Sequence, residues 1–230
     1  MGFTELSHAF IAAKYYVYLK EAFGGRGEAA FLHATRYYGE QRGRRMAQRA
    51  IRDGKPLTYE TYCQYGEWVS TEETQKQGLA NQSKVVSVSP DYQIRIFVCP
   101  WHTQFQRMGL TDAGLLYCQD LDASIARGFN PEIHYETSQT LHDHDYCIQT
   151  IENAGLTPDS NMTKNPAGIR SFEYHCAHSY WAYSEVCQAI FGEEGRQIAQ
   201  KVLDDFAAEY GTDMADTLAG YAGTNFNIAD

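Results

Sequence analysis

Three cysteines stand in short segments that also carry proline, histidine or aspartate, and chemistry is expected there. Cys99 opens a Cys-Pro-Trp-His step, Cys118 lies in YCQDLD and Cys147 closes LHDHDYC. A thiolate attacks carbon and binds metals, and a nearby cation or hydrogen-bond donor lowers the pKa of the thiol. The six cysteines show no tight spacing, so we expect reduced thiols, with Cys63 and Cys187 as small core residues.

A predicted β-hairpin would put Cys147 on a polar surface. The segments HYETS, from residue 134, and YCIQTI, from residue 146, both alternate in polarity, and QTLHDH joins them. In the simplest register Glu136 faces Cys147 and His134 faces Gln149. Because side chains alternate across a strand, the other face would be apolar.

The segment that ends at Cys99 is predicted to be a third strand, with Ile94 and Ile96 on its apolar side. If it joins the hairpin, Cys99 lines one surface with His134, Glu136 and Cys147. Arg95 is then the expected cation for a negatively charged group of a substrate.

A helix is predicted from a cap at Thr111 to Gly128. Cys118 and Asp122 are four residues apart and share a face, while Asp120 points away. A carboxylate raises the pKa of a neighbouring thiol rather than lowering it. We therefore expect Asp122 to orient a histidine or to accept a hydrogen bond from an amidine-like substrate nitrogen.

These residues suggest a catalytic set with Cys147 as nucleophile, or as ligand of a metal that carries a water molecule. His134 or His144 would be the base, and Asp145 or Asp122 would orient it.

A divalent metal is the competing interpretation. Its ligands would come from the HDHDYC segment and the other thiols, namely His142, His144, Cys147 and Cys99 or Cys118. His175 and His178 lie three residues apart on another predicted helix, and we expect them to line the substrate pocket.

The two ends of the chain resemble each other. In both, a helix, a glycine break (AFGGRG and IFGEEG) and a second helix follow one another, so that Tyr15, Phe23 and Gly27 align with Tyr183, Phe191 and Gly195. The shared FG-x-x-G element favours duplication over coincidence.

The predicted architecture is α+β, with a small antiparallel sheet packed among helices. One domain would span 1–230, with helical hairpins at 8–50 and 172–220 around a sheet and central helix at 85–152. Residues 53–84 are ambiguous, and 155–168 form a loop.

Charge and hydropathy exclude several kinds of partner. The net charge of −10 argues against nucleic acid and anionic membranes, and no apolar run reaches bilayer length. The basic stretch RGRRMAQR (42–49) is expected to be the solvated face of a helix. With no signal-peptide pattern at the start, we expect a cytoplasmic protein that binds a small molecule; a homo-oligomer stays open.

The order CP (99–100), YCQDLD (117–122), GFNP (128–131) and D-x-C (145–147) resembles the L-2-amino-thiazoline-4-carboxylic acid hydrolase family. The FGGRG and FGEEG helices fit as well. The resemblance implies hydrolysis of a small cyclic amidine-like carboxylate, and it places these residues at or near the site: Cys99, Cys118, Asp122, Asp145 and Cys147. One departure is LHDHDYC, where the resemblance implies a glycine shortly before the cysteine.

The leading hypothesis is therefore a cytosolic hydrolase of a C–N or C–S bond in a small heterocyclic carboxylate. The alternative is a non-catalytic domain that binds or senses a small molecule or a metal-containing ligand. A third reading, a structural helical oligomer, is disfavoured by the polar face of the sheet.

Overall fold

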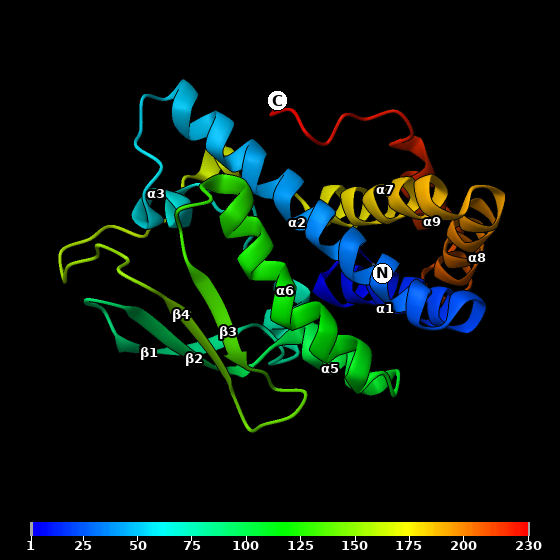
Figure 1. Cartoon of the computed structure of the whole chain (residues 1–230), viewed down its shortest axis with the longest axis horizontal. Coiled ribbons are helices and arrows are strands. Elements are labelled where there is room, and N and C mark those ends of the chain that lie inside the picture. Colours follow the sequence, from blue (N-terminus) through cyan, green and yellow to red (C-terminus); the bar gives the residue numbers. More distant parts are fainter. Residues whose placement is uncertain (1, 230) are drawn as a thin grey trace.

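Helices at both ends of the chain pack together, and a four-stranded sheet lies beside them (Figure 1). The structure is a computed structural model that describes residues 2–229. Its helices are α1 (Glu5–Phe23), α2 (Gly25–Arg52), α3 (Tyr59–Gln64), α4 (Glu72–Lys76), α5 (Pro100–Arg107), α6 (Thr111–Phe129), α7 (Phe172–Phe191), α8 (Glu193–Tyr210) and α9 (Thr212–Gly220). The strands are β1 (Gln82–Ser87), β2 (Tyr92–Val98), β3 (Tyr135–Gln139) and β4 (Cys147–Ile151). The predicted α+β class is confirmed.

The FG-x-x-G element has the same structural role in both hairpins. Gly24 and Gly192 have φ of 56° and 59°, which is open to glycine without strain, and each separates two helices. A side chain at Gly27 would put its Cβ 1.8 Å from the carbonyl oxygen of Leu19. At Gly195 the Cβ would lie 2.1 Å from the carbonyl oxygen of Cys187. Glycine is thus needed both for the turn and for the close approach that follows it.

Residues that the repeat aligns also meet in space. The rings of Phe23 and Phe191 stack with centroids 3.7 Å apart, and those of Tyr15 and Tyr183 with centroids 5.1 Å apart. The second helices differ in length, because α2 continues to Arg52 whereas α8 ends before Gly211, which has a φ of 98°. The two hairpins therefore pack against each other through aligned residues, which the sequence comparison did not predict.

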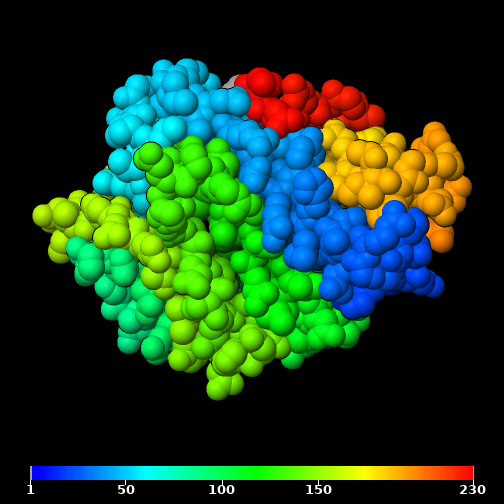
Figure 2. Space-filling model, viewed as in Figure 1, coloured from blue at the N-terminus to red at the C-terminus, as the bar shows by residue number. Residues whose placement is uncertain are grey.

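Helix α6 crosses α2 at close range through glycines. A Cβ at Gly43 would lie 2.1 Å from the carbonyl oxygen of Ile125, and one at Gly128 would lie 2.4 Å from that of Glu40. Gly128 is therefore a packing residue inside α6, and not the predicted helix end. Thr111 is the first helical residue rather than its cap, a role that falls to Leu110. Figure 2 shows the two helices side by side on one face, with the C-terminal segment against α2.

The sheet has the order β1-β2-β4-β3, and each neighbouring pair is antiparallel. Its inner face is the one that packs toward α6.

The predicted register of the β3–β4 hairpin is wrong. Thr137 pairs with Gln149, and a register shift follows between Thr137 and Gln139. This irregularity reverses the faces of β3, so Glu136 is exposed on the outer side while Cys147 is buried on the inner side.

Strand β2 does join the hairpin, as predicted, but it turns its apolar side toward the thiol. Ile96 pairs with Cys147 and both are buried, whereas Arg95 pairs with Ile148. The guanidinium of Arg95 lies over the ring of Tyr146, 4.8 Å from its centroid. Arg95 is therefore on the outer face of the sheet, and the prediction that it faces the cleft is wrong.

Several short elements were not predicted from the sequence. Residues 53–84 contain α3, α4 and the start of β1, and α5 begins directly after Cys99 with Pro100 in its first turn. The predicted loop at 155–168 is confirmed apart from the short 3-10 turn Pro166–Gly168. Within residues 2–229, no helix is long and apolar enough to cross a membrane.

Candidate functional site

A buried cavity of about 80 Å³ lies between the inner face of the sheet and helices α2, α5 and α6. Its walls come from six elements and three connecting segments. The lining residues are Arg42, Trp68, Asn81, Ile96, Cys99, Trp101, Tyr117, Cys118, Leu121, Asp122, Thr137, Cys147 and Gln149. Charged, amide, thiol and aromatic groups therefore share one enclosed space.

The three thiols singled out in the sequence all line this cavity. Cys99, Cys118 and Cys147 are unpaired cysteines. Burial raises the pKa of all three thiols, that of Cys99 to about 12. The backbone N–H of Leu141 donates to Cys147 Sγ at 3.2 Å. The resting thiols are therefore protonated near neutral pH, and a thiolate forms only if a base takes the proton.

Asp122 is held in place by a chain of hydrogen bonds from the sheet. Gln149 donates to its carboxyl group at 2.7 Å, and the Tyr135 hydroxyl donates to Gln149 at 2.6 Å. Burial raises the pKa of Asp122, while the charge of Arg42 and the Gln149 hydrogen bond oppose that rise. The predicted common face of Cys118 and Asp122 is confirmed. Asp120 points away, toward Arg36 at 2.7 Å.

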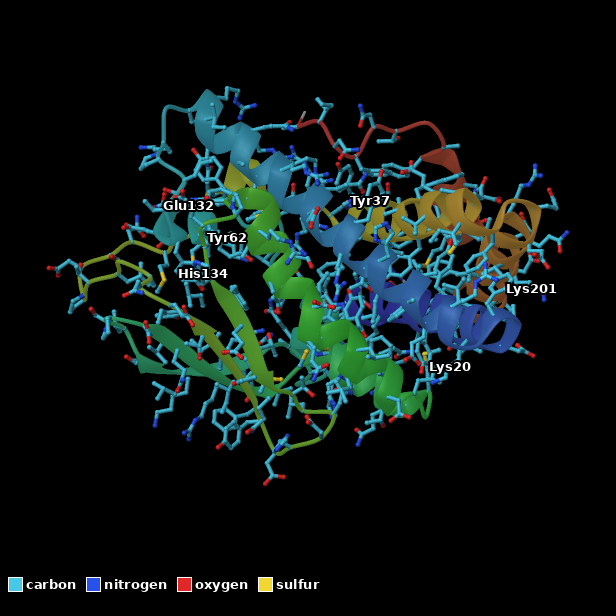
Figure 3. All side chains as sticks on the ribbon, in the orientation of Figure 1. Lys20, Tyr37, Tyr62, Glu132, His134 and Lys201 are labelled. Carbon is cyan, nitrogen blue, oxygen red and sulfur yellow. The ribbon has the colours of Figure 1, made fainter. Side chains whose placement is uncertain are left out.

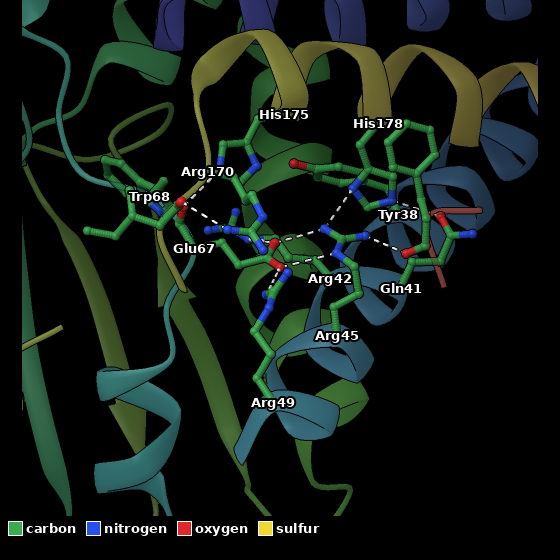
Figure 4. Close-up of polar contacts among 12 residues, drawn as sticks. Tyr38, Gln41, Arg42, Arg45, Arg49, Glu67, Trp68, Arg170, His175 and His178 are labelled. Atoms are coloured by element: carbon green, nitrogen blue, oxygen red, sulfur yellow. Dashed lines mark hydrogen bonds and ion pairs between the residues drawn. The ribbon is translucent and has the colours of Figure 1, made fainter. Parts of the chain in front are cut away.

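The basic stretch on α2 is buried, so the expected solvated face is wrong. Arg42, Arg45 and Arg49 are 6%, 0% and 2% exposed, and all three surround the carboxylate of Glu67 (Figure 4). Their spacing of three and four residues puts them on one side of the helix. That side faces the core, and Arg44 alone of the four arginines in the stretch is exposed.

Glu67 binds two of these arginines tightly and the third loosely. Arg45 forms two hydrogen bonds to it, at 3.1 and 2.8 Å, and Arg49 forms one at 2.6 Å. Arg42 Nε stands 3.7 Å from the carboxylate and, among the described residues, has no hydrogen-bond partner. Burial opposes ionisation of Glu67, but the arginine charges outweigh it and lower its pKa to about 2. Arg42, which also lines the cavity, is thus the arginine available to an anion.

His175 and His178 lie behind this cluster rather than in the cavity wall. His175 Nε2 lies 3.1 Å from the backbone oxygen of Glu67, and His178 contacts Gln41 at 2.9 Å and Arg45 at 3.3 Å (Figure 4). Burial lowers the pKa of both imidazoles, that of His175 to about 3. The pocket-lining role predicted for them is wrong; they fill the core beside the arginines.

The predicted bases His134 and His144 and the predicted carboxylate Asp145 lie outside the cavity. His134 is exposed at the start of β3 (Figure 3), and its carbonyl accepts from the backbone N–H of Glu152 at 3.0 Å. That pairing places His134 five residues along the hairpin from Cys147, roughly 17 Å at about 3.3 Å per residue. His144 and Asp145 are also exposed, in the loop between β3 and β4. His144 pairs with Asp143 at 3.1 Å.

The predicted metal set does not assemble. The part of the chain that the structure describes contains no group of three or more His, Cys, Asp or Glu side chains placed to hold a metal ion. Cys99, Cys118 and Cys147 do converge, but His144 stays outside with the loop.

Two features of the site were missed in the sequence. One is Arg42. Its spacing of four residues from Tyr38 and from Met46, both buried, could have indicated that it lies on the buried side of the helix. The other is the contact between Cys118 and His142, which was expected only in the metal set: His142 Nε2 lies 3.4 Å from Cys118 Sγ. His142 reaches α6 from a loop, so no local spacing could have indicated that contact.

The fold and the cavity together define an α+β protein with a small cavity lined by three thiols. The chain belongs to the L-2-amino-thiazoline-4-carboxylic acid hydrolase family, whose model matches residues 4–147. The matched region contains every cavity-lining residue except Gln149. No functionally curated protein and no solved structure matches the chain significantly.

Proposed function

We propose that this protein hydrolyses a C–N or C–S bond in a small, cyclic, amidine-like carboxylate. The observation that carries the proposal is that the cavity brings together the Arg42 guanidinium, the Asp122 carboxyl group and three thiols. The family match supports the reaction class. The six unpaired cysteines suit the reducing cytoplasm, where we place the reaction.

Arg42 and Asp122 would recognise the two charged ends of such a substrate. The Arg42 guanidinium would bind the carboxylate, because its Nε lacks a hydrogen-bond partner among the described residues and guanidinium groups bind carboxylates through parallel hydrogen bonds. Asp122, held by Gln149, would accept hydrogen bonds from the amidine nitrogens. The rings of Trp68 and Trp101 contact each other with centroids 5.2 Å apart, and together they would offer an apolar wall for the substrate ring.

The reacting atom would be the ring carbon bonded to both nitrogen and sulfur. A cavity thiol attacks this carbon, and its proton passes to a base as the C=N electron pair moves to nitrogen. Cleavage of a ring C–N or C–S bond leaves a thiol-bound amidine carbon, and the ring atom that departs takes up the proton. Water then replaces the cysteine sulfur, which returns as a thiol, and the product carries the water oxygen as its carbonyl.

A second function has one specific observation in its favour. The second function is a small-molecule sensor. The raised pKa of all three cavity thiols is typical of unreactive, buried cysteines, and a sensor needs no reactive thiol. The two functions differ in whether the bound molecule is changed.

The test is to incubate the purified protein with L-2-amino-thiazoline-4-carboxylate and to follow the ring-opened product directly. We expect turnover by wild type far above the uncatalysed rate. Arg42→Gln should raise KM, and the substitution should cause a smaller loss of activity with an analogue that lacks the carboxylate. Binding that raises the melting temperature without any product would instead establish the sensor function. If the protein neither binds the compound nor turns it over, both functions are refuted.

A further inference from the structure

We propose that Cys118 is the nucleophile of this site and that His142 is its base. The inference rests on the proposed hydrolase function and selects one of the three cavity thiols. Cys118 Sγ and His142 Nε2 are 3.4 Å apart, within the range of a hydrogen bond to sulfur. Within residues 2–229, Cys147 has its hydrogen bond from a backbone N–H, which cannot accept a proton.

The histidine is fitted to this place by α6. Gly114 lies one turn before Cys118, and a Cβ there would be 2.1 Å from His142 Cε1 and 2.6 Å from both ring nitrogens. The ring therefore occupies the space that any other residue at position 114 would fill. Phe105 meets the same ring edge-on, with centroids 5.8 Å apart.

The loop that carries His142 is braced by a side-chain turn. The Thr140 hydroxyl donates to Asp143 at 2.7 Å and accepts from the backbone N–H of His142 at 3.2 Å. These bonds link three of the four residues before His144. They leave the His142 ring directed at α6, while the His144 ring is exposed.

A second histidine sets the tautomer that the base needs. His102 Nδ1 lies 3.4 Å from His142 Nδ1, so one of the two nitrogens must carry the proton. If His142 Nδ1–H donates to His102, its Nε2 is bare and accepts the Cys118 proton. Burial lowers the pKa of His102, which keeps its ring neutral and able to accept. His102 is thus a positioning residue.

His142 then carries the protons that the reaction moves. His142 Nε2 takes the Cys118 proton as sulfur attacks the ring carbon, and it gives that proton to the departing ring nitrogen or sulfur. It next takes a proton from the attacking water, and it returns this proton to Cys118 when the carbon–sulfur bond breaks. Charged and titratable groups facing His142 are Asp143, His102 and Cys118.

Two substitutions test the Cys118–His142 pair through the reaction rate. His142→Gln removes the base, and Gly114→Ala keeps both residues but displaces the imidazole ring from Cys118. We expect either change to lower kcat by about a hundredfold or more, as loss of a general base does. His144→Gln, in the same loop but outside the cavity, is the matched control and should stay close to wild type.

Alkylation of the substrate-free protein by iodoacetamide, mapped by mass spectrometry, tests the pair without any turnover. Cys118 should react more slowly in His142→Gln than in wild type, relative to Cys147, and at the wild-type rate in His144→Gln. His102→Ala should slow alkylation of Cys118 as well. In His102→Asn, which keeps an acceptor near Nδ1, Cys118 should react at the wild-type rate.

Two results would overturn the assignment. One is a Cys118→Ser protein with wild-type kcat while Cys147→Ser is inactive. The other is Cys118 alkylation that does not depend on residue 142. If wild type shows the predicted labelling pattern but opens no ring, the pair stands and the proposed reaction fails.

Discussion

At the scale of single residues, the buried arginines of α2 decide what the cavity can bind. Three guanidinium groups surround one carboxylate, and two of them are fully engaged by it. The third, Arg42, has its Nε 3.7 Å from that carboxylate and also lines the cavity, and in the proposed function it would bind the substrate carboxylate. Glu67 offsets part of the positive charge of the three guanidinium groups, so that they can be buried without leaving isolated charges in the core.

Glu67→Gln should be among the most destabilising conservative substitutions in this protein. It leaves Arg45 and Arg49 buried without their counter-charge, and breaking a buried ion pair costs about 3–5 kcal/mol. Chemical denaturation measures the free energy of unfolding. Asp120→Asn is the matched control, because its pair with Arg36 is at the surface and such pairs contribute about 0–1 kcal/mol. Equal losses in both variants would contradict the account of the cluster.

At the scale of elements, the α2–α6 crossing positions Arg42 against Asp122 and Cys118. The two backbones approach so closely because Gly43 and Gly128 have no side chain where they touch. The cavity on the sheet side of this crossing keeps its shape only while the two helices stay at that distance.

Gly43→Ala should therefore destabilise the fold by about 1–3 kcal/mol, since a methyl group would collide with backbone atoms that cannot yield. Gly25→Ala is the control, because nothing lies within 4 Å of its Cβ and alanine favours a helix. Thermal unfolding of the two variants checks the prediction. A Gly43→Ala protein as stable as Gly25→Ala would show that the helices can separate at little cost.

The long helices and the pairing of β3 with β4 could be predicted from the sequence because their signals are local. Helical periodicity, the FG-x-x-G breaks and the i, i+4 spacing of Cys118 and Asp122 all lie within one or two turns. The β3 register could not be predicted, because the irregularity near Ser138 depends on how the loop folds and reverses the faces of the strand. The burial of charge on α2 depends on Glu67, which lies in a segment without a clear pattern.

At the scale of the whole molecule, the core is rich in neutral histidines. Burial lowers the pKa of His8, His142, His175 and His178, to about 4 for His142 and about 3 for His175. In the unfolded chain these groups bind protons below about pH 6.5. The folded state binds them only at lower pH, so it loses stability as the pH falls.

We expect the denaturation midpoint to be constant above about pH 6.5 and to fall steadily from there toward pH 4. The lowered pKa of Glu67 adds to this slope only below about pH 5, where the carboxyl group of the unfolded chain begins to bind a proton and that of the folded protein does not. Urea titrations at half-unit pH steps check this. A midpoint that stays level down to pH 4.5 would mean that the histidines take up protons in the folded protein.

The most direct test of the central claim is the rate of ring opening of L-2-amino-thiazoline-4-carboxylate by wild type and by Asp122→Asn, measured side by side. Asparagine keeps the shape and an acceptor for Gln149 but removes the charge that faces the cavity. A charged hydrogen bond contributes about 1.5–3 kcal/mol, so the substitution should lower kcat/KM at least about tenfold. Equal rates in the two proteins, or no ring opening by either, would contradict the claim that this cavity performs the reaction.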